Sequence, residues 1–454
     1  MGKNNPHRLG NEPVLKLLVK LSIPSVIGML VNSLYNIIDS IYIGHLSTDG
    51  LAALSLAFPI QLFLISIAGG FGVATSSLIS RLLGEGNQEK VKETTQFVTM
   101  ATLAYAVIAG LFGFFFAGDI IALFTSDTAL ISMGGSYLRI VMSGSVFMII
   151  PMVFNNFLRG HGDTFNPMIT MLIGATANII IDPFLIYGLF FFPSLGVSGA
   201  AYATIFSRSL GAVYVVWVLI KQRYYLNIRA FIPDKRIIKE LINIGVPAVA
   251  MMLLGSIMLM GANKIIALYS AVGIAVMGVY SRLLSLILMP IMGLGQGFQP
   301  LLGYNYGANN INRVRKTLSS GLFFAMLFSG LSFLLFILFP GLIMSVFTND
   351  PELISTGAIA LKRISIAFPF MGVSMLVSIA FQSIGKGLPS FLISLLRQII
   401  LLLPLLYLLA EYHGLAYAWY AFPIAESVSF VVAAVWLTAY LYRKGIIWRG
   451  WNVS

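Results

Sequence analysis

The stretch NSLYNIID, residues 32–39, places polar side chains inside the first long apolar segment of the chain. If this segment is a helix, four polar residues share one face at spacings of three and four: Asn32, Tyr35, Asn36 and Asp39. A carboxylate is costly in hydrocarbon, so it normally faces a water-lined interior or a protein partner. We therefore expect Asp39 to bind a proton or a cation; a structural hydrogen bond between helices is the alternative.

The composition of the whole chain is typical of a polytopic membrane protein. Its 454 residues are 58% hydrophobic and only 10% charged, whereas a soluble domain carries about 25% charged residues. Long unbroken apolar runs, rather than alternation, favour helices over a closed barrel. The runs predict an all-α integral membrane protein with twelve spans, near residues 14–43, 51–82, 92–117, 128–152, 165–190, 197–220, 238–268, 273–304, 314–339, 352–381, 390–410 and 415–442.

The charged residues between these spans predict the orientation of the chain. Loops on one side collect lysine and arginine, including Lys90, Arg236 and Lys444, while loops on the other side hold acids such as Asp127 and Asp350. The positive-inside rule then puts both termini in the cytoplasm of a multi-pass protein of the cell membrane, the inner one where there are two. The net charge of +12 follows largely from these loops, so nucleic acid is not an expected partner.

The two halves of the chain repeat each other at an offset of 223 residues. Gly84 corresponds to Gly307 in this way, and the segment Phe124–Asp127 corresponds to Phe347–Asp350. Two copies of six spans that both start in the cytoplasm form a parallel repeat. We expect an N-lobe of residues 1–232, cytoplasmic connector included, and a C-lobe of residues 233–454, with a central cleft between them and alternating access.

A second polar group lies in the fifth and sixth spans. Asn178 and Asp182 are four residues apart and share a helix face, with Pro183 beside the acid, while Thr204 adds a hydroxyl on the next span. Two carboxylates with amide and hydroxyl oxygens suit a proton or a hard monovalent cation. The predicted cation or proton site is Tyr35, Asp39, Asn178, Asp182 and Thr204, with Na⁺ as a possible occupant at Asp39, Asn178, Asp182 and Thr204.

The second half is not a chemical copy of the first, because Asp39 corresponds to Ala262 at the same offset. Its seventh span carries Lys264 instead, which could bind substrate, snorkel, or form a buried pair with Glu426; we favour the pair. Methionines of this half suggest an adaptable pocket. The predicted substrate cleft is Asn32, Asn36, Met260, Lys264, Arg282, Met289 and Gln296.

These motifs resemble the multidrug and toxic compound extrusion (MATE) family, within the multidrug/oligosaccharidyl-lipid/polysaccharide (MOP) exporter superfamily. The resemblance rests on residues 35–39, 43–44, 51–54, 157–163, 178–183 and 196–204, and on residues 289–300 and 304–307, which look most like the MepA-type branch. It implies two six-helix lobes around a V-shaped cleft, export of organic cations coupled to inward H⁺ or Na⁺, and the N-lobe site named above. One departure, the absence of a carboxylate on the seventh span, disfavours coupling through the C-lobe.

The function expected from all this is a secondary active multidrug efflux antiporter that confers antibiotic resistance. It exports organic cations or amphipathic drugs in exchange for H⁺ or Na⁺, needs no cofactor beyond that ion, and works as a monomer in the lipid bilayer. The alternative is a lipid or lipid-linked oligosaccharide flippase of the same superfamily. An integral membrane enzyme is disfavoured, because the four histidines form no ligand motif, and a channel gives no reason for two lobes with kinked helices.

Overall fold

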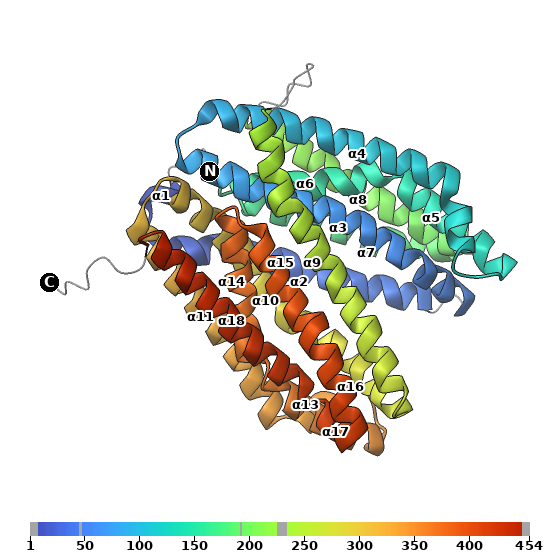
Figure 1. Ribbon diagram of the computed structural model, residues 1–454. Helices are drawn as coiled ribbons and strands as arrows, with labels where there is room; N and C mark the ends of the chain where they lie inside the picture. Colours follow the sequence, from blue (N-terminus) through green and yellow to red (C-terminus); the bar gives the residue numbers. More distant parts are fainter. Residues whose placement is uncertain (1–7, 45–47, 191–192, 225–233, 447–454) are drawn as a thin grey trace.

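The computed structural model describes residues 8–44, 48–190, 193–224 and 234–446, and within these ranges the regular structure is helical (Figure 1). The first half comprises α1 (Arg8–Asn11), α2 (Val14–Gly44), α3 (Thr48–Gly84), α4 (Gln88–Ala122), α5 (Thr128–Ser143), α6 (Ser145–Gly160), α7 (Phe165–Tyr187) and α8 (Gly196–Lys221). The second half comprises α9 (Lys235–Ala267), α10 (Ala271–Gly307), α11 (Ile311–Leu338), α12 (Pro340–Ser345), α13 (Pro351–Ser365), α14 (Phe368–Ser383), α15 (Gly387–Leu395), the π-helix η1 (Leu396–Leu401), α16 (Leu402–His413), α17 (Leu415–Ala418) and α18 (Ala421–Arg443).

Ten of the described helices or continuous helical segments are long and apolar enough to cross a membrane, and two bent pairs bring the total to twelve. The pair α5 and α6 bends by 50°, and the pair α13 and α14 bends by 49°. Pro369 lies in the first turn of α14, where its missing N–H and fixed φ suit a new helix start but not the continuation of α13. The predicted all-α fold of twelve spans in two lobes is confirmed.

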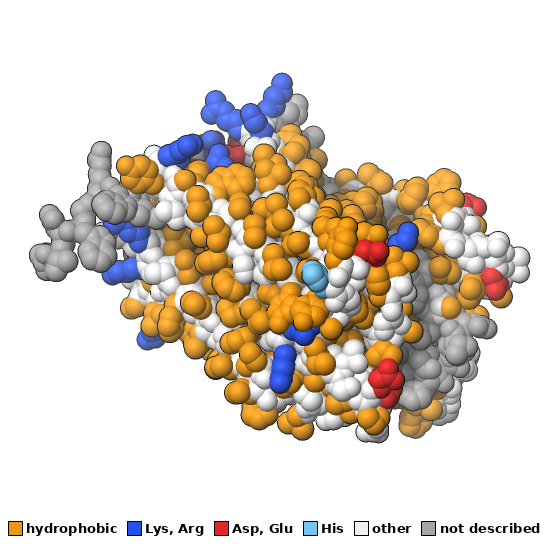
Figure 2. All heavy atoms as spheres, turned by 60° about the horizontal axis from the view of Figure 1, so that its bottom comes forward, with side chains coloured by type: hydrophobic (Ala, Val, Ile, Leu, Met, Phe, Trp, Pro, Cys, Tyr) orange, Lys and Arg blue, Asp and Glu red, His pale blue; other side chains and the backbone are white. Residues whose placement is uncertain are grey.

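The two lobes meet at one end and diverge toward the other. In Figure 1 the helices converge near α1 and the start of α11, while α5 and α17 lie far apart at the opposite end. The predicted boundary between lobes, at residues 232 and 233, lies outside the described ranges, so it stays a prediction. On the face shown in Figure 2, the exposed side chains are largely apolar, as expected for a surface that faces lipid.

Contacts between the lobes obey the same offset of 223 as the sequence repeat. A Cβ added at Gly84 would lie 2.0 Å from the carbonyl oxygen of Tyr304, and one at Gly307 would lie 2.1 Å from the carbonyl oxygen of Arg81. Each contact is the other one shifted by 223 residues. Such reciprocal contacts are what two equivalent halves around a two-fold axis produce, and they need glycine because the helix backbones touch.

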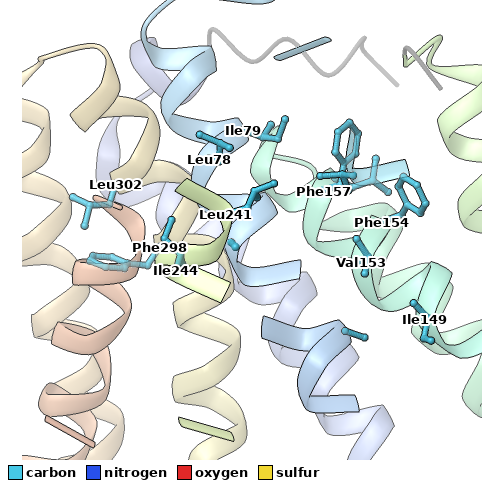
Figure 3. Packing of buried hydrophobic residues seen from close by; sticks show 14 of the residues in the cluster. Leu78, Ile79, Ile149, Val153, Phe154, Phe157, Leu241, Ile244, Phe298 and Leu302 are labelled. Atoms are coloured by element: carbon cyan, nitrogen blue, oxygen red, sulfur yellow. The ribbon is translucent and has the colours of Figure 1, made fainter. Parts of the chain in front are cut away.

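Polar bonds and one apolar cluster hold this end closed. Ser77 of α3 donates its hydroxyl hydrogen bond to the carbonyl of Gln382 in α14, at 2.6 Å. Arg81 of α3 lies 2.9 Å from a carboxylate oxygen of Glu240 in α9. The buried hydrophobic cluster crosses the lobe boundary here, joining α3, α6, α9 and α10 (Figure 3); its labelled members are Leu78, Ile79, Ile149, Val153, Phe154, Phe157, Leu241, Ile244, Phe298 and Leu302.

Candidate functional site

A cavity of about 920 Å³ lies between the lobes. Its walls come from α2, α3, α6, α7 and α8 on one side, and from α9, α10, α14, α15, η1, α16 and α18 on the other. Ligand pockets for drug-sized molecules measure about 300–1,000 Å³. The space between the lobes is therefore large enough for such a molecule.

The lining is dominated by thioethers and amides. Ten methionines face it: Met29, Met148, Met152, Met171, Met251, Met252, Met258, Met292, Met371 and Met375. Eight amide side chains accompany them: Asn32, Asn155, Asn156, Asn178, Gln296, Gln299, Gln382 and Gln398. Methionine is flexible and polarisable, so a wall of this kind can adapt to apolar groups of different shape. The amides can donate and accept hydrogen bonds while adding no charge to the cavity wall.

Four of the five N-lobe residues predicted to bind a cation have described side chains. Tyr35, Asn178 and Thr204 line the cavity. Asp182 is fully buried behind the wall, and the Asn178 amide donates a hydrogen bond to its Oδ1 at 3.0 Å. Both lie in α7, and Pro183, which has no N–H, removes the helical hydrogen bond to the carbonyl of Ile179 beside them.

One amide atom of Asn178 is left unsatisfied by the described part of the chain. Its Oδ1 is buried and has no hydrogen-bond partner among the described residues. Such an orphaned acceptor is costly, and a bound ion or donor would satisfy it. Helix α2 continues through Asn36 and Asp39, but these two side chains lie outside the part of the chain that is described, so their predicted roles stay predictions.

The predicted C-lobe residues divide by helix face. Gln296 lines the cavity, as does Asn32 across from it in the N-lobe. Lys264, Arg282 and Met260 are exposed and, with the half-buried Met289, lie outside the cavity lining. The sequence grouped them by segment, whereas the lining faces are residues 248, 251, 252, 255, 258 and 259 of α9 and residues 280, 281, 284, 285, 288, 292, 295, 296 and 299 of α10.

The expected pair between Lys264 and Glu426 is wrong. Glu426, which is 9% exposed, accepts a hydrogen bond at 3.0 Å from Nη1 of Arg397. Arg397 lies in the π-helix η1, where the N–H of Leu402 bonds to its carbonyl five residues earlier. One-turn π-helices occur often at functional sites. Arg397 and Gln398, two polar residues seven and six positions before the helical Pro404, were the signal for this site in the sequence, where Arg397 is interpreted as structural or interfacial.

Two further cations lie on the cavity wall, although the sequence indicates a structural or interfacial role for Arg208 and a cytoplasmic loop charge for Arg159. Arg159 ends α6 and Arg208 lies in α8, one turn beyond Thr204. By contrast, His161 carries no charge near neutral pH. Burial against Phe157 and Tyr224 lowers its pKa to about 4, so His161 is not a proton carrier at pH 7. The described residues include no group of three or more histidines or acids able to hold a metal.

The profile of the MatE family matches residues 24–184 and again residues 247–408. The multidrug export protein MepA of Staphylococcus aureus is 29% identical over 440 residues, 95% of each chain. A protein described as an FAD transporter from Shewanella oneidensis is 28% identical over 422 residues, 92% of this chain and 93% of that one.

Solved structures resemble the chain over nearly its whole length. An outward-facing multidrug resistance MATE transporter of the MOP superfamily has a TM-score of 0.91 at 26% identity, covering 98% of this chain and 99% of that one. A MOP superfamily transporter from Pyrococcus furiosus, described as having a binding pocket of reverse polarity, has a TM-score of 0.89 at 26% identity, covering 97% and 99%. The chain therefore belongs to the MatE family and is a MepA-like MATE transporter, not an enzyme.

Proposed function

We propose that this protein is an efflux antiporter that exports amphipathic drug-sized molecules, organic cations among them, in exchange for H⁺ or Na⁺. The observation that carries the proposal is the methionine- and amide-lined cavity between two lobes that meet at one end and diverge toward the other. On the loop charges, we place the closed end and both termini in the cytoplasm of the cell membrane. The described conformation is then outward-open, and each monomer works alone.

We assign ion coupling to Asp39, Asn178, Asp182, Tyr35 and Thr204. Binding neutralises the buried acid and repacks α2, which contains Pro24. Helix α2 touches both lobes: Gly28 faces Met171 of α7, while Val26 faces Gly293 of α10. A shift of α2 at the ion site would therefore also move its contacts with α10 at the lobe interface. An electrochemical gradient supplies about 2.3 kcal/mol per charge and 100 mV for this step.

The test is efflux of rhodamine 6G from proteoliposomes under a pH gradient and, separately, a Na⁺ gradient. We expect one gradient to drive efflux in the wild type, and Asp182→Asn and Asp39→Asn to abolish coupling. Asp127→Asn is the matched control, because Asp127 is an exposed helix cap and asparagine caps equally well. Full coupling in both Asp182→Asn and Asp39→Asn would overturn the assignment.

The flippase alternative needs cationic side chains in the cleft that bind a phosphate-bearing lipid. The residues expected to supply them, Lys264 and Arg282, lie outside the cavity lining. The lining does hold Arg159, Arg208 and the paired Arg397, but methionines and amides outnumber these arginines, so we keep efflux of amphipathic molecules as the proposal.

A further inference from the structure

The charged side chains on the cavity wall are mostly cationic. Among the described lining residues four are charged: Arg159, Arg208, Arg397 and Glu426. Glu426 is bonded to Arg397, so this pair is neutral as a whole. Arg159 and Arg208 form no ion pair within the described ranges. The described wall of a cavity expected to take cations therefore carries two uncompensated positive charges.

Arg159 is buried and only partly satisfied. Arg159 lines the cavity, and the residue is only 7% exposed. Nη1 donates a 3.2 Å hydrogen bond to Asn156, and Nη2 lies 3.9 Å from the sulfur of Met171. Its Nε has no hydrogen-bond partner among the described residues. A buried guanidinium without an anion is costly, and an anionic ligand would remove much of that cost.

Arg208 belongs to the same wall. Helix α7 contacts both regions. Its Met171 touches Arg159, and residues on either side of Met171 pack against α8. Gly174 lies against Ser207, and Thr170 lies against Gly211, on either side of Arg208 along that helix. Arg159 and the stretch of α8 that carries Arg208 therefore both lie against one turn of α7, residues 170–174, and both arginines line the cavity. The buried Ser207 hydroxyl on this wall also lacks a partner among the described residues.

We propose that Arg159, Arg208 and the amides beside them form a subsite for the acidic group of an amphipathic substrate, a carboxylate or a phosphate. Guanidinium forks bind both groups through paired, charge-assisted hydrogen bonds. The methionines of the remaining wall take the apolar part. This inference rests on the proposed function and extends it: the cavity exports anionic and zwitterionic amphiphiles as well as organic cations.

The test compares two ligands that share a ring system and differ in one acidic group, riboflavin and riboflavin 5′-phosphate. Their binding to protein in phosphatidylcholine nanodiscs is measured by flavin fluorescence. We expect the phosphate to bind at least tenfold more tightly than riboflavin. Arg208→Gln and Arg159→Gln should each remove that preference while changing riboflavin affinity less than twofold. Arg139→Gln, an exposed arginine of α5 outside the cavity lining, is the matched control.

Two results would overturn the inference: equal affinity for the two flavins, or a preference that survives both substitutions. Rhodamine 6G binding separates this from the proposed function. If rhodamine 6G binds but neither flavin does, the anion subsite is wrong and the efflux proposal stands; if none of the three binds, both fail. Adding phosphatidylglycerol to the nanodiscs identifies the source of the acidic group, since competition with the bound phosphate would mark a lipid headgroup as an occupant.

Discussion

Replacing Gly307 by alanine should force open the closed end of the transporter. The added Cβ would lie 2.1 Å from the carbonyl oxygen of Arg81, whereas real Cβ contacts are essentially never under 3.0 Å. The backbones of α3 and α10 must therefore separate by at least 3.0 − 2.1 = 0.9 Å. Overpacking of this kind costs about 1–3 kcal/mol, which lowers the population of the closed-end conformation about 5- to 150-fold relative to its alternative.

The chain has no cysteine, so spin labels can be attached at Glu89→Cys and Asn312→Cys without background. These exposed positions start α4 and α11, equivalent helices of the two lobes. Electron–electron double resonance should show a longer distance gaining population in Gly307→Ala. Gly278→Ala is the control, since that glycine of the same helix has nothing within 4 Å. If Gly307→Ala gave the same distance distribution as the wild type, the contact between Gly307 and Arg81 would not control the closed end.

Three further predictions concern charged groups. Arg397→Gln leaves Glu426 buried without its cation and should destabilise the protein by about 3–5 kcal/mol. In a thermal melt, the double variant with Glu426→Gln should recover most of this loss of stability. If the losses of the two single variants simply added, the two residues would not form a direct pair. Glu240→Gln should weaken the closed end by about 1 kcal/mol at most, because the Glu240 side chain facing Arg81 is 43% exposed; the spin-label pair would show it, and a shift as large as that of Gly307→Ala would contradict it. His161 has a pKa of about 4 when folded, against 6.5 unfolded, so stability should be full above pH 6.5 and fall by up to about 3 kcal/mol toward pH 4; His161→Phe should flatten this part of the melting-temperature profile, and an unchanged profile would contradict the assignment.

Much of the fold can be predicted from the sequence. A membrane helix makes all its backbone hydrogen bonds within itself, so each span is visible in the sequence as a long apolar run. The repeat gave the arrangement of the lobes as well. Gly84 and Gly307 were paired by sequence offset alone, and they prove to make reciprocal backbone contacts across the lobe interface. Positions where two backbones touch tolerate no Cβ, so the same residue recurs in both halves.

The cavity was harder to predict, because hydropathy identifies segments but not the face that each presents. Asn178 and Asp182 were found together, since a spacing of four fixes them on one helix face whatever the packing. Lys264 was assigned to the cleft by its segment, yet it lies on an exposed face. Arg397 was interpreted as structural or interfacial, and its place on the cavity wall was not predicted, because the π-helix around it changes the usual helical spacing and no simple period predicts such an insertion.

Alternating access requires the two lobes to rock about this cavity and to open the end that is closed here. Arg81→Cys and Glu240→Cys, at an ion pair across the closed end, can be bridged by a short bifunctional methanethiosulfonate reagent and released by dithiothreitol. Each single-cysteine variant serves as a control. The bridged protein should still bind rhodamine 6G but lose gradient-driven efflux, and it should regain efflux on reduction. Undiminished efflux with the bridge in place would contradict alternating access through this interface.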